Sequence, residues 1–374
     1  MKALGIVFSN IHDKEIAELT AHRTLASVPF GGRYRLIDFV LSNMINSGIT
    51  KVGIITKENY QSLMDHLGSG KQWDLSRKNG GLFVLPPYGT TGSKLYKSRF
   101  EAIGNAANFL LRSSEEYVVM SDCDTVCNLD FAPIIKEHIN SKADITVVYR
   151  KAVIDEGIET DRTFFEVDSK NRVTRTINSK KIYGEQNLFT NILVVGRKFL
   201  LNILGDAELK GYKSFSKDIL TKTKEFKIVG VPLDGYFAAI DCLSSYYTVS
   251  MELLQKENRD VLFYKNGNNI YTKLRDSAPL VTGEKAEISN SLIADGCIIE
   301  GEVKNSILFR GVKVEKGAKV HNSILFQDAF VGSRSTLNCV IADKQVSIGE
   351  KITLSGHETS PHFIGKRKAL VGKG

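Results

Sequence analysis

Hydrophobic and polar residues follow two different rhythms along the chain. Up to about residue 245, short apolar runs rich in β-branched residues alternate with segments whose apolar residues recur at helical spacing. The strand-like runs lie at 52–56, 117–120, 145–149 and 191–195, and the helical segments include 36–47 and 100–111. This alternation predicts an α/β domain whose mostly parallel sheet is covered by helices.

A second rhythm begins after residue 280. The phrases N-S-L-I-A-D-G, N-S-I-L-F-R-G, N-S-I-L-F-Q-D and N-C-V-I-A-D-K begin at Asn290, Asn305, Asn322 and Asn338, at intervals of 15, 17 and 16 residues. A period this short predicts a parallel β-helix of hexapeptide type, in which each coil buries its apolar corners on the next. An antiparallel meander with similar turns is the alternative.

The change of rhythm also predicts the domain limits. The α/β domain is expected at 1–245 and the β-helix at 281–374. Between them, 246–280 contains a helical Y-Y-T-V-S-M-E-L-L-Q segment and a polar N-G-N-N, and it is expected to be a connector.

Composition narrows the possible partners. No apolar stretch approaches the roughly 18 residues of a membrane span, and the apolar start is too short for a secretory signal. The five cysteines show neither C-x-x-C pairing nor zinc spacing, so we expect reduced, buried thiols in a cytoplasmic protein. The net charge of +8 is compatible with anionic ligands, but no basic or aromatic stripe indicates nucleic acid.

The turn after the first apolar run is unusual for a nucleotide-binding domain. Such turns are normally rich in glycine, because backbone N–H groups must crowd around phosphates. Here the sequence V-F-S-N-I-H-D-K-E-I-A-E-L-T contains no glycine. The loop is therefore either a different kind of site or a phosphate loop that has been lost.

A longer run resolves this question by resemblance. The segment V-P-F-G-G-R-Y-R-L-I-D-F-V-L-S-N-M-I-N-S-G-I at 28–49 closely resembles the block after the phosphate loop in glucose-1-phosphate adenylyltransferases. Further matches follow in the family's order: H-L-G-S-G-K-Q-W-D-L, V-L-P-P-Y, S-F-S-K-D-I-L and D-G-Y-F. The resemblance spans nearly the whole chain.

The resemblance implies a Rossmann-like nucleotidyltransferase domain followed by a left-handed parallel β-helix. Members of the family are usually tetramers that make ADP-glucose and pyrophosphate from ATP and glucose 1-phosphate with Mg²⁺. Many respond to glycolytic intermediates that bind where the two domains meet.

The chain departs from the family in the phosphate loop. Aligned from Val28, the three loop glycines fall on Asn10, Ile11 and Asp13, and the loop arginine falls on Glu15. The lysine that follows the loop in the family becomes Leu25. We expect the acidic pair Asp13 and Glu15 to face the polyphosphate position, where like charges repel.

The metal ligands that the resemblance implies are also incomplete. Asp124 takes the first metal position, as a vestige, and Asp122 could join it in a small acidic cluster. Ala239 replaces the second metal aspartate, and Asp241 lies two residues away. Asp241 could compensate only through a shift of the backbone.

The sugar-phosphate motif departs as well. Its lysine falls on Ser179, although a slip in the alignment puts Lys180 or Lys181 in that role. The small residues that line the family's substrate pocket become Ile192 and Phe100, so we expect one of these to fill space that substrate normally occupies.

These losses predict a poor catalyst or none. Removing one preorganised charge-stabilising group typically costs about 10² to 10³ in rate, and at least three are absent, so the loss should exceed roughly 10⁴. We expect no catalytic residues and no cofactor requirement for the chain alone. The pattern resembles the non-catalytic, GlgD-type subunit of glycogen-storing bacteria, which implies a catalytic homologue as partner and Mg²⁺ in that partner.

A regulatory anion site is the remaining expectation. Arg33 and Arg35 stand where the family often gathers cations for phosphorylated effectors, and with His66 they are the candidate residues. Lys366, Arg367 and Lys368 could join them from the β-helix. The predicted assembly is a hetero-oligomer, expected to be a tetramer, or a homo-oligomer. Alternatives are an active adenylyltransferase using Asp122, Asp124 and Asp241, a stand-alone sensor of sugar phosphates or nucleotides, and a β-helix acyltransferase.

Overall fold

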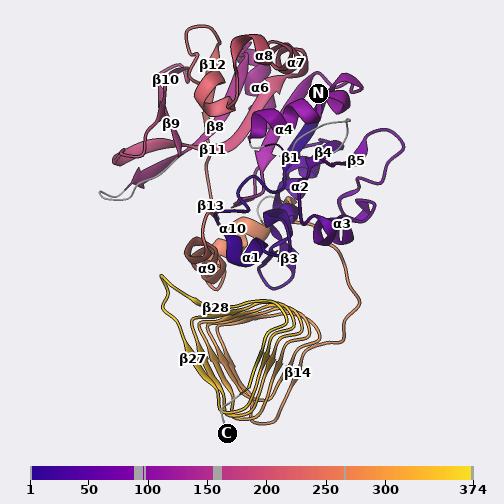
Figure 1. Cartoon of the computed structure of the whole chain (residues 1–374), viewed down its shortest axis with the longest axis vertical. Coiled ribbons are helices and arrows are strands. Elements are labelled where there is room, and N and C mark those ends of the chain that lie inside the picture. The colour runs from indigo at the N-terminus through magenta and orange to yellow at the C-terminus, as the bar shows by residue number, and fades with distance from the viewer. Residues whose placement is uncertain (1, 88–95, 97, 155–161, 265–266, 372–374) are drawn as a thin grey trace.

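The computed structural model describes residues 2–87, 96, 98–154, 162–264 and 267–371. Figure 1 shows an α/β domain at the top and a triangular stack of strands below it. Both predicted architectures are therefore confirmed, in the predicted order along the chain. The stacked strands pair only in parallel, which excludes the antiparallel meander.

The α/β domain is built on one mixed sheet with the order β10-β9-β11-β6-β1-β4-β5, to which β8 and β12 are joined through β11. Its strands are β1 (Ala3–Phe8), β4 (Lys51–Ile55), β5 (Gly81–Leu85), β6 (Tyr117–Asp122), β8 (Ile145–Ile154), β9 (Thr163–Val167), β10 (Val173–Asn178), β11 (Gly184–Gly196) and β12 (Ile228–Pro232). The central strands β6, β1, β4 and β5 are parallel, whereas β11 runs antiparallel to β6 and β8. Apolar side chains on both faces of the central strands are buried, as expected for a sheet covered by helices.

Helices flank this sheet. They are α1 (Ala17–Thr20), α2 (Leu36–Asn46), α3 (Gln61–Leu67), α4 (Arg99–Asn105), α5 (Ala107–Leu111), α6 (Ala132–Ser141), α7 (Arg197–Gly205) and α8 (Ala207–Lys210), with a π-helical turn at Phe215–Ile219 and 3-10 turns at Leu25–Ser27 and Lys71–Trp73. The helical segment predicted at 100–111 is interrupted at Ala106, which ends α4 and begins α5. Ser98 caps α4 by accepting a hydrogen bond from the backbone N–H of Glu101, and this cap fixes where Arg99 leaves the helix.

The β-helix has three faces of short parallel strands. The first face contains β14 (Val281–Thr282), β17 (Ile298–Ile299), β20 (Lys313–Val314), β23 (Phe330–Val331), β26 (Ser347–Ile348) and β29 (Ala369–Leu370). The second contains β15 (Glu287–Ser289), β18 (Glu302–Lys304), β21 (Lys319–His321), β24 (Thr336–Asn338) and β27 (Thr353–Ser355). The third contains β16 (Leu292–Ile293), β19 (Ile307–Leu308), β22 (Ile324–Leu325), β25 (Val340–Ala342) and β28 (His362–Ile364).

The fourth recurring phrase is out of register by one residue. Asn290, Asn305 and Asn322 turn the chain with positive φ angles of 42°, 47° and 47°. In the fourth coil this conformation falls on Cys339, because Asn338 still belongs to β24 and pairs with His321. The step between coils is therefore 17 residues there rather than the 16 that the phrase spacing suggested.

Two helices separate the domains in Figure 1, α9 (Leu243–Glu252) and α10 (Lys256–Phe263). The Tyr246 hydroxyl donates to the Pro29 carbonyl at 2.6 Å, and the Tyr247 hydroxyl donates to the Asn322 carbonyl at 2.7 Å. Tyr246 also lies edge-on to Phe326 of the β-helix. Helix α9 is thus hydrogen-bonded to both domains and packed in one apolar cluster with them.

Two short ribbons complete the α/β domain: β2 (Pro29–Phe30) with β3 (Tyr34–Arg35), and β7 (Thr125–Cys127) with β13 (Phe237–Ala239). Four of the five cysteines are buried and Cys242 is exposed, so the expectation of buried thiols is wrong for Cys242, which caps α9 at the surface. Among the described residues, no helix has the length and apolar character that crossing a membrane requires.

Candidate functional site

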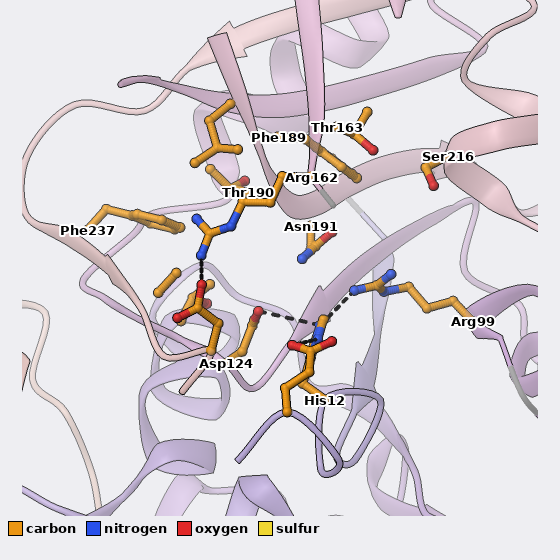
Figure 2. Close-up of a pocket in the computed structure, with 15 residues that line it drawn as sticks. His12, Arg99, Asp124, Arg162, Thr163, Phe189, Thr190, Asn191, Ser216 and Phe237 are labelled. Carbon is orange, nitrogen blue, oxygen red and sulfur yellow. Dashed lines mark hydrogen bonds and ion pairs between the residues drawn. The ribbon is translucent and has the colours of Figure 1, made fainter. Parts of the chain in front are cut away.

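A cavity of about 440 Å³ lies beyond the carboxyl ends of β1 and β6 (Figure 2). In an open α/β sheet this edge is where ligands normally bind. The lining side chains are mostly polar: His12, Glu15, Arg99, Asp124, Thr125, Arg162, Thr163, Thr190, Asn191, Ser216 and Asp241, with Leu188, Phe189, Phe237 and Ala239. The resemblance to glucose-1-phosphate adenylyltransferases implies that substrates of a catalytic relative bind at this edge.

The imidazole of His12 holds the loop after β1 against the end of β6. Its Nε2 lies 2.9 Å from Asp122 Oδ2 and 3.5 Å from Asp124 Oδ2, and its Nδ1 lies 3.0 Å from Glu15 Oε2. Burial acts to lower the pKa of His12, but these carboxylates outweigh it and raise the pKa to about 10. The three carboxylates therefore favour the protonated form of His12.

Arg99 of α4 binds the carboxylate of Asp122, which His12 also contacts. Its Nε lies 3.0 Å from both Oδ1 and Oδ2 of Asp122, and its Nη2 also donates to Asp122 Oδ2. Nη2 lies 2.9 Å from His12 Nε2 (Figure 2), and both side chains contact the buried carboxylate of Asp122. Although burial opposes ionisation of Asp122, the two cations lower its pKa to about 2.

The neighbouring carboxyl group of Asp124 has its pKa shifted in the opposite direction to that of Asp122. Burial, together with the charge of Asp122, raises the pKa of the Asp124 carboxyl above its usual range, although His12 acts in the opposite direction. Its Oδ1 is buried and has no hydrogen-bond partner among the described residues. Asp124 is 6% exposed, and a buried carboxylate oxygen without a partner is unusual in a folded protein.

A second ion pair, between Arg162 and Asp241, joins two residues that line the cavity. Arg162 immediately precedes β9, and Asp241 precedes α9. Ala239, at the position of the missing metal aspartate, also lines the cavity. Asp241 therefore reaches the site without a shift of the backbone, but its carboxylate is already paired with a guanidinium.

The loop side chains turn away from a phosphate position. Asn10 accepts a hydrogen bond from Tyr96 at 2.9 Å, and Ile11 packs against the hydrophobic core. Asp13 accepts from the backbone N–H of Leu25 at 2.8 Å, and Leu25 itself is buried. The expectation that both Asp13 and Glu15 face the polyphosphate position is therefore corrected: only Glu15 lines the cavity.

The residues expected to fill the pocket do not line it. Ile192 and Phe100 are 1% and 4% exposed and belong to the hydrophobic core on the two sides of the sheet, so that expectation is wrong. The residue before Phe100, Arg99, reaches into the pocket instead. Ser179 bonds only locally with Lys181, and Lys180 and Lys181 are exposed outside the cavity lining.

The Mg²⁺ that the family uses does not fit these residues. Mg²⁺ requires near-octahedral oxygen ligands and usually one or two ionised carboxylates. Here the oxygens of Asp122 are engaged by Arg99 and His12, and Ala239 offers no ligand. An ion at this position would compete with Arg99 and His12 for the oxygens of Asp122.

A second cluster of charge lies at the junction of the domains. Arg23 is 2% exposed and donates through Nη2 to both oxygens of Asp343, at 2.8 and 2.9 Å, while its Nη1 has no partner in the described part of the chain. Burial, together with the charges of Arg35, Arg23 and Arg275, lowers the pKa of Lys344 to about 7. Lys344 thus feels the positive charge of Arg35, Arg23 and Arg275 and the negative charge of Asp343, a combination that favours an added anion.

The predicted effector residues lie in and around this junction cluster. Arg35 is buried, donates to the carbonyl and hydroxyl of Ser62, and has its pKa lowered to about 10 by burial. His66 is 4% exposed and lies 2.6 Å from Asp38, whereas Arg33 is exposed. The turn that carries Lys366, Arg367 and Lys368 joins Lys344 through the backbone hydrogen bond from Arg367 N–H.

Sequence reasoning missed four of these residues. His12 falls on a variable position of the family's loop motif, and Arg99 directly precedes Phe100, one of the altered pocket positions. Arg162 and Lys344 carry no local signal. For Arg99 a signal existed, because a cation inserted near a retained pair of carboxylates could have been expected to bind them.

Comparison with known proteins agrees with the fold and the order of the domains. Residues 14–160 match the nucleotidyl transferase family, and residues 277–360 match the GlmU-like C-terminal hexapeptide family. Over 374 residues the chain is 35% identical to the glycogen biosynthesis protein GlgD of Bacillus subtilis (strain 168), which covers 98% of this chain and 96% of that protein.

Two further relatives show the same range of similarity. The chain is 36% identical over 320 residues to the GlgD protein of Geobacillus stearothermophilus, covering 85% of this chain and 83% of that protein. It is 31% identical over 355 residues to the glucose-1-phosphate adenylyltransferase of Bacillus mycoides (strain KBAB4), covering 93% of each. Because this identity extends over nearly the whole length, the chain belongs to the family of bacterial GlgD proteins and glucose-1-phosphate adenylyltransferases.

Proposed function

We propose that this chain acts in glycogen biosynthesis as a non-catalytic subunit that assembles with a catalytic glucose-1-phosphate adenylyltransferase and adjusts its rate. The observation that carries the proposal is the engagement of Asp122 by Arg99 and His12. The names of the relatives, GlgD and adenylyltransferase, support the pathway and the class of partner.

The chemistry of nucleotidyl transfer explains why the site argues against catalysis. The reaction needs positive charge on the triphosphate and a metal held by carboxylates. In this chain Glu15 adds negative charge at the loop, and the carboxylates are already neutralised by Arg99, His12 and Arg162. Conversion of ATP and glucose 1-phosphate to ADP-glucose and pyrophosphate, with its Mg²⁺, is therefore assigned to the partner.

The junction cluster supports a regulatory role. A phosphorylated effector would place negative charge among Arg35, Arg275 and Lys344, where the nearby cations depress the pKa of Lys344 in spite of Asp343. Helix α9 contacts both domains beside this cluster, so the charge of the effector would act on the packing between them. Arg33, Lys366, Arg367 and Lys368 are proposed as its outer rim.

A rate titration tests the proposal. A catalytic homologue is mixed with increasing amounts of this chain at fixed ATP, Mg²⁺ and glucose 1-phosphate, with and without sugar phosphates. We expect the rate or the effector midpoint to change and then saturate at a fixed subunit ratio, and light scattering to show a hetero-oligomer, expected to be a tetramer. A flat titration, with no mixed oligomer, would contradict the role.

One observation favours a second candidate, an active enzyme with a rearranged site. Asp241 lines the same cavity as Asp124 and could replace the missing metal aspartate if Arg162 released it. Pyrophosphate release by the purified chain alone, with ATP, Mg²⁺ and glucose 1-phosphate, distinguishes this candidate. Robust turnover without a partner would overturn the non-catalytic proposal.

A further inference from the structure

The cation that neutralises Asp122 belongs to the chain itself. We infer that Arg99 masks a transition-metal site formed by His12, Asp122 and Asp124, and that a tethered guanidinium has replaced an exchangeable ion there. The inference concerns the metal affinity of the isolated chain, so it stands or falls separately from the proposed regulatory role.

The three masked residues are arranged as metal ligands. One ligand atom from each lies within 4.8 Å of the others. A second observation is independent of this spacing. Asp124 is only 6% exposed, and its Oδ1 has no hydrogen-bond partner among the described residues. One imidazole with two carboxylates suits Mn²⁺, Co²⁺ or Zn²⁺ better than Mg²⁺, which prefers oxygen ligands.

Arg99 closes this site by geometry and by charge. Its guanidinium binds both oxygens of Asp122 and lies 2.9 Å from the His12 nitrogen that a metal would need. Charge-assisted contacts of this kind are among the stronger hydrogen bonds in proteins. A divalent ion would have to displace the guanidinium while being repelled by it at short range.

A tethered cation has a consequence that a bound ion does not have. Through its contacts with His12 and Asp122, the guanidinium of Arg99 holds the 9–16 loop against the end of β6 at every concentration of divalent metal. The α/β domain therefore keeps one loop position whether or not metal and nucleotide are present.

The test compares Mn²⁺ binding by wild-type and variant chains, with free Mn²⁺ measured by electron paramagnetic resonance. Arg99→Thr replaces the guanidinium with a short uncharged side chain, and we expect this variant to bind one Mn²⁺ per chain on the order of tenfold or more tightly than wild type. Arg162→Thr is the matched control, because it removes the other guanidinium of the cavity and leaves Arg99 in place. It should bind no more Mn²⁺ than wild type.

The site assignment is checked by adding Asp122→Asn to Arg99→Thr, which should abolish the gained binding. If Arg99→Thr does not fold, Arg99→Gln removes the charge while keeping an amide in reach of Asp122. Mn²⁺ should then raise the melting temperature of that variant and not of wild type. Wild-type chain that binds Mn²⁺ as tightly as the variants, or a folded variant that gains no binding, overturns the inference.

Discussion

Nε of Arg99 lies 3.0 Å from both carboxylate oxygens of Asp122, so the first residue of α4 binds the carboxylate at the end of strand β6. The pair joins α4 to the edge of the sheet where a nucleotide would lie. The pocket keeps its position and much of its polarity, but its carboxylates are balanced by guanidinium and imidazolium groups. We therefore expect this site to bind an added cation weakly.

The purified chain should not make ADP-glucose at a useful rate. Because the loop glycines, the loop arginine and one metal aspartate are replaced, we expect turnover at least roughly 10⁴-fold below that of a catalytic relative. Pyrophosphate release under identical ATP, Mg²⁺ and glucose 1-phosphate measures this. A rate within tenfold of the relative would show that Asp241 or another group has taken over.

Asp343→Ala should destabilise the chain strongly. The substitution leaves the guanidinium of Arg23, 2% exposed, without its counter-charge, which typically costs about 3–5 kcal/mol of unfolding free energy. Asp241→Ala is the matched control, because its pair with Arg162 is more than one third exposed and should contribute less than about 1 kcal/mol. Urea unfolding of the two variants gives the comparison, and equal losses would contradict it.

Stability should rise with pH above neutrality because of Lys344. Burial and the neighbouring arginines lower its folded-state pKa to about 7 from 10.5, so between these values the unfolded chain binds more protons than the folded chain. The unfolding free energy then increases by up to about 1.4 kcal/mol per pH unit across this window, and the penalty is fully present below pH 7. Lys344→Met should be more stable than wild type at pH 7 and should show a flatter profile up to pH 10.

Binding of an anion at the junction should take up protons. A phosphate group beside Lys344 would favour its charged form and raise its pKa, so binding of a sugar phosphate near pH 8 should draw protons from the buffer. Calorimetry in two buffers of different ionisation enthalpy measures this uptake. Lys344→Met should lose it while Lys366→Met should keep it, and uptake unchanged by Lys344→Met would place the anion elsewhere.

Tyr246→Phe should loosen the contact between the domains. The hydroxyl of Tyr246 is buried and donates to the Pro29 carbonyl at 2.6 Å, so its loss leaves that carbonyl unsatisfied at a cost of about 1–3 kcal/mol. Tyr264→Phe, at a residue 73% exposed, is the control and should change little. Thermal unfolding of both variants provides the measurement, and hydrogen exchange at the residues around Pro29 should rise only in Tyr246→Phe.

The sequence by itself determined the architecture. Alternating apolar runs predicted the sheet and its helices, and the recurring Asn phrases predicted the β-helix, because local periodicity decides which face of each element is buried. It also identified the altered loop and the replacement of a metal-binding aspartate by Ala239, since a position in an aligned motif can be read without coordinates. The sequence did not predict the register of the fourth coil, because Cys339 rather than an Asn adopts the positive φ angle there.

Only the tertiary structure decided what the altered residues do. Arg99 and Asp122 are 23 positions apart, and Arg23 and Asp343 are 320 apart, so no periodicity could pair them. Asp13 accepts a hydrogen bond from the Leu25 backbone while Glu15 contacts His12 and lines the cavity, and neither partner could be identified from the sequence. Electrostatic partners are selected by distance in space and by burial, and both arise only when the whole chain has folded.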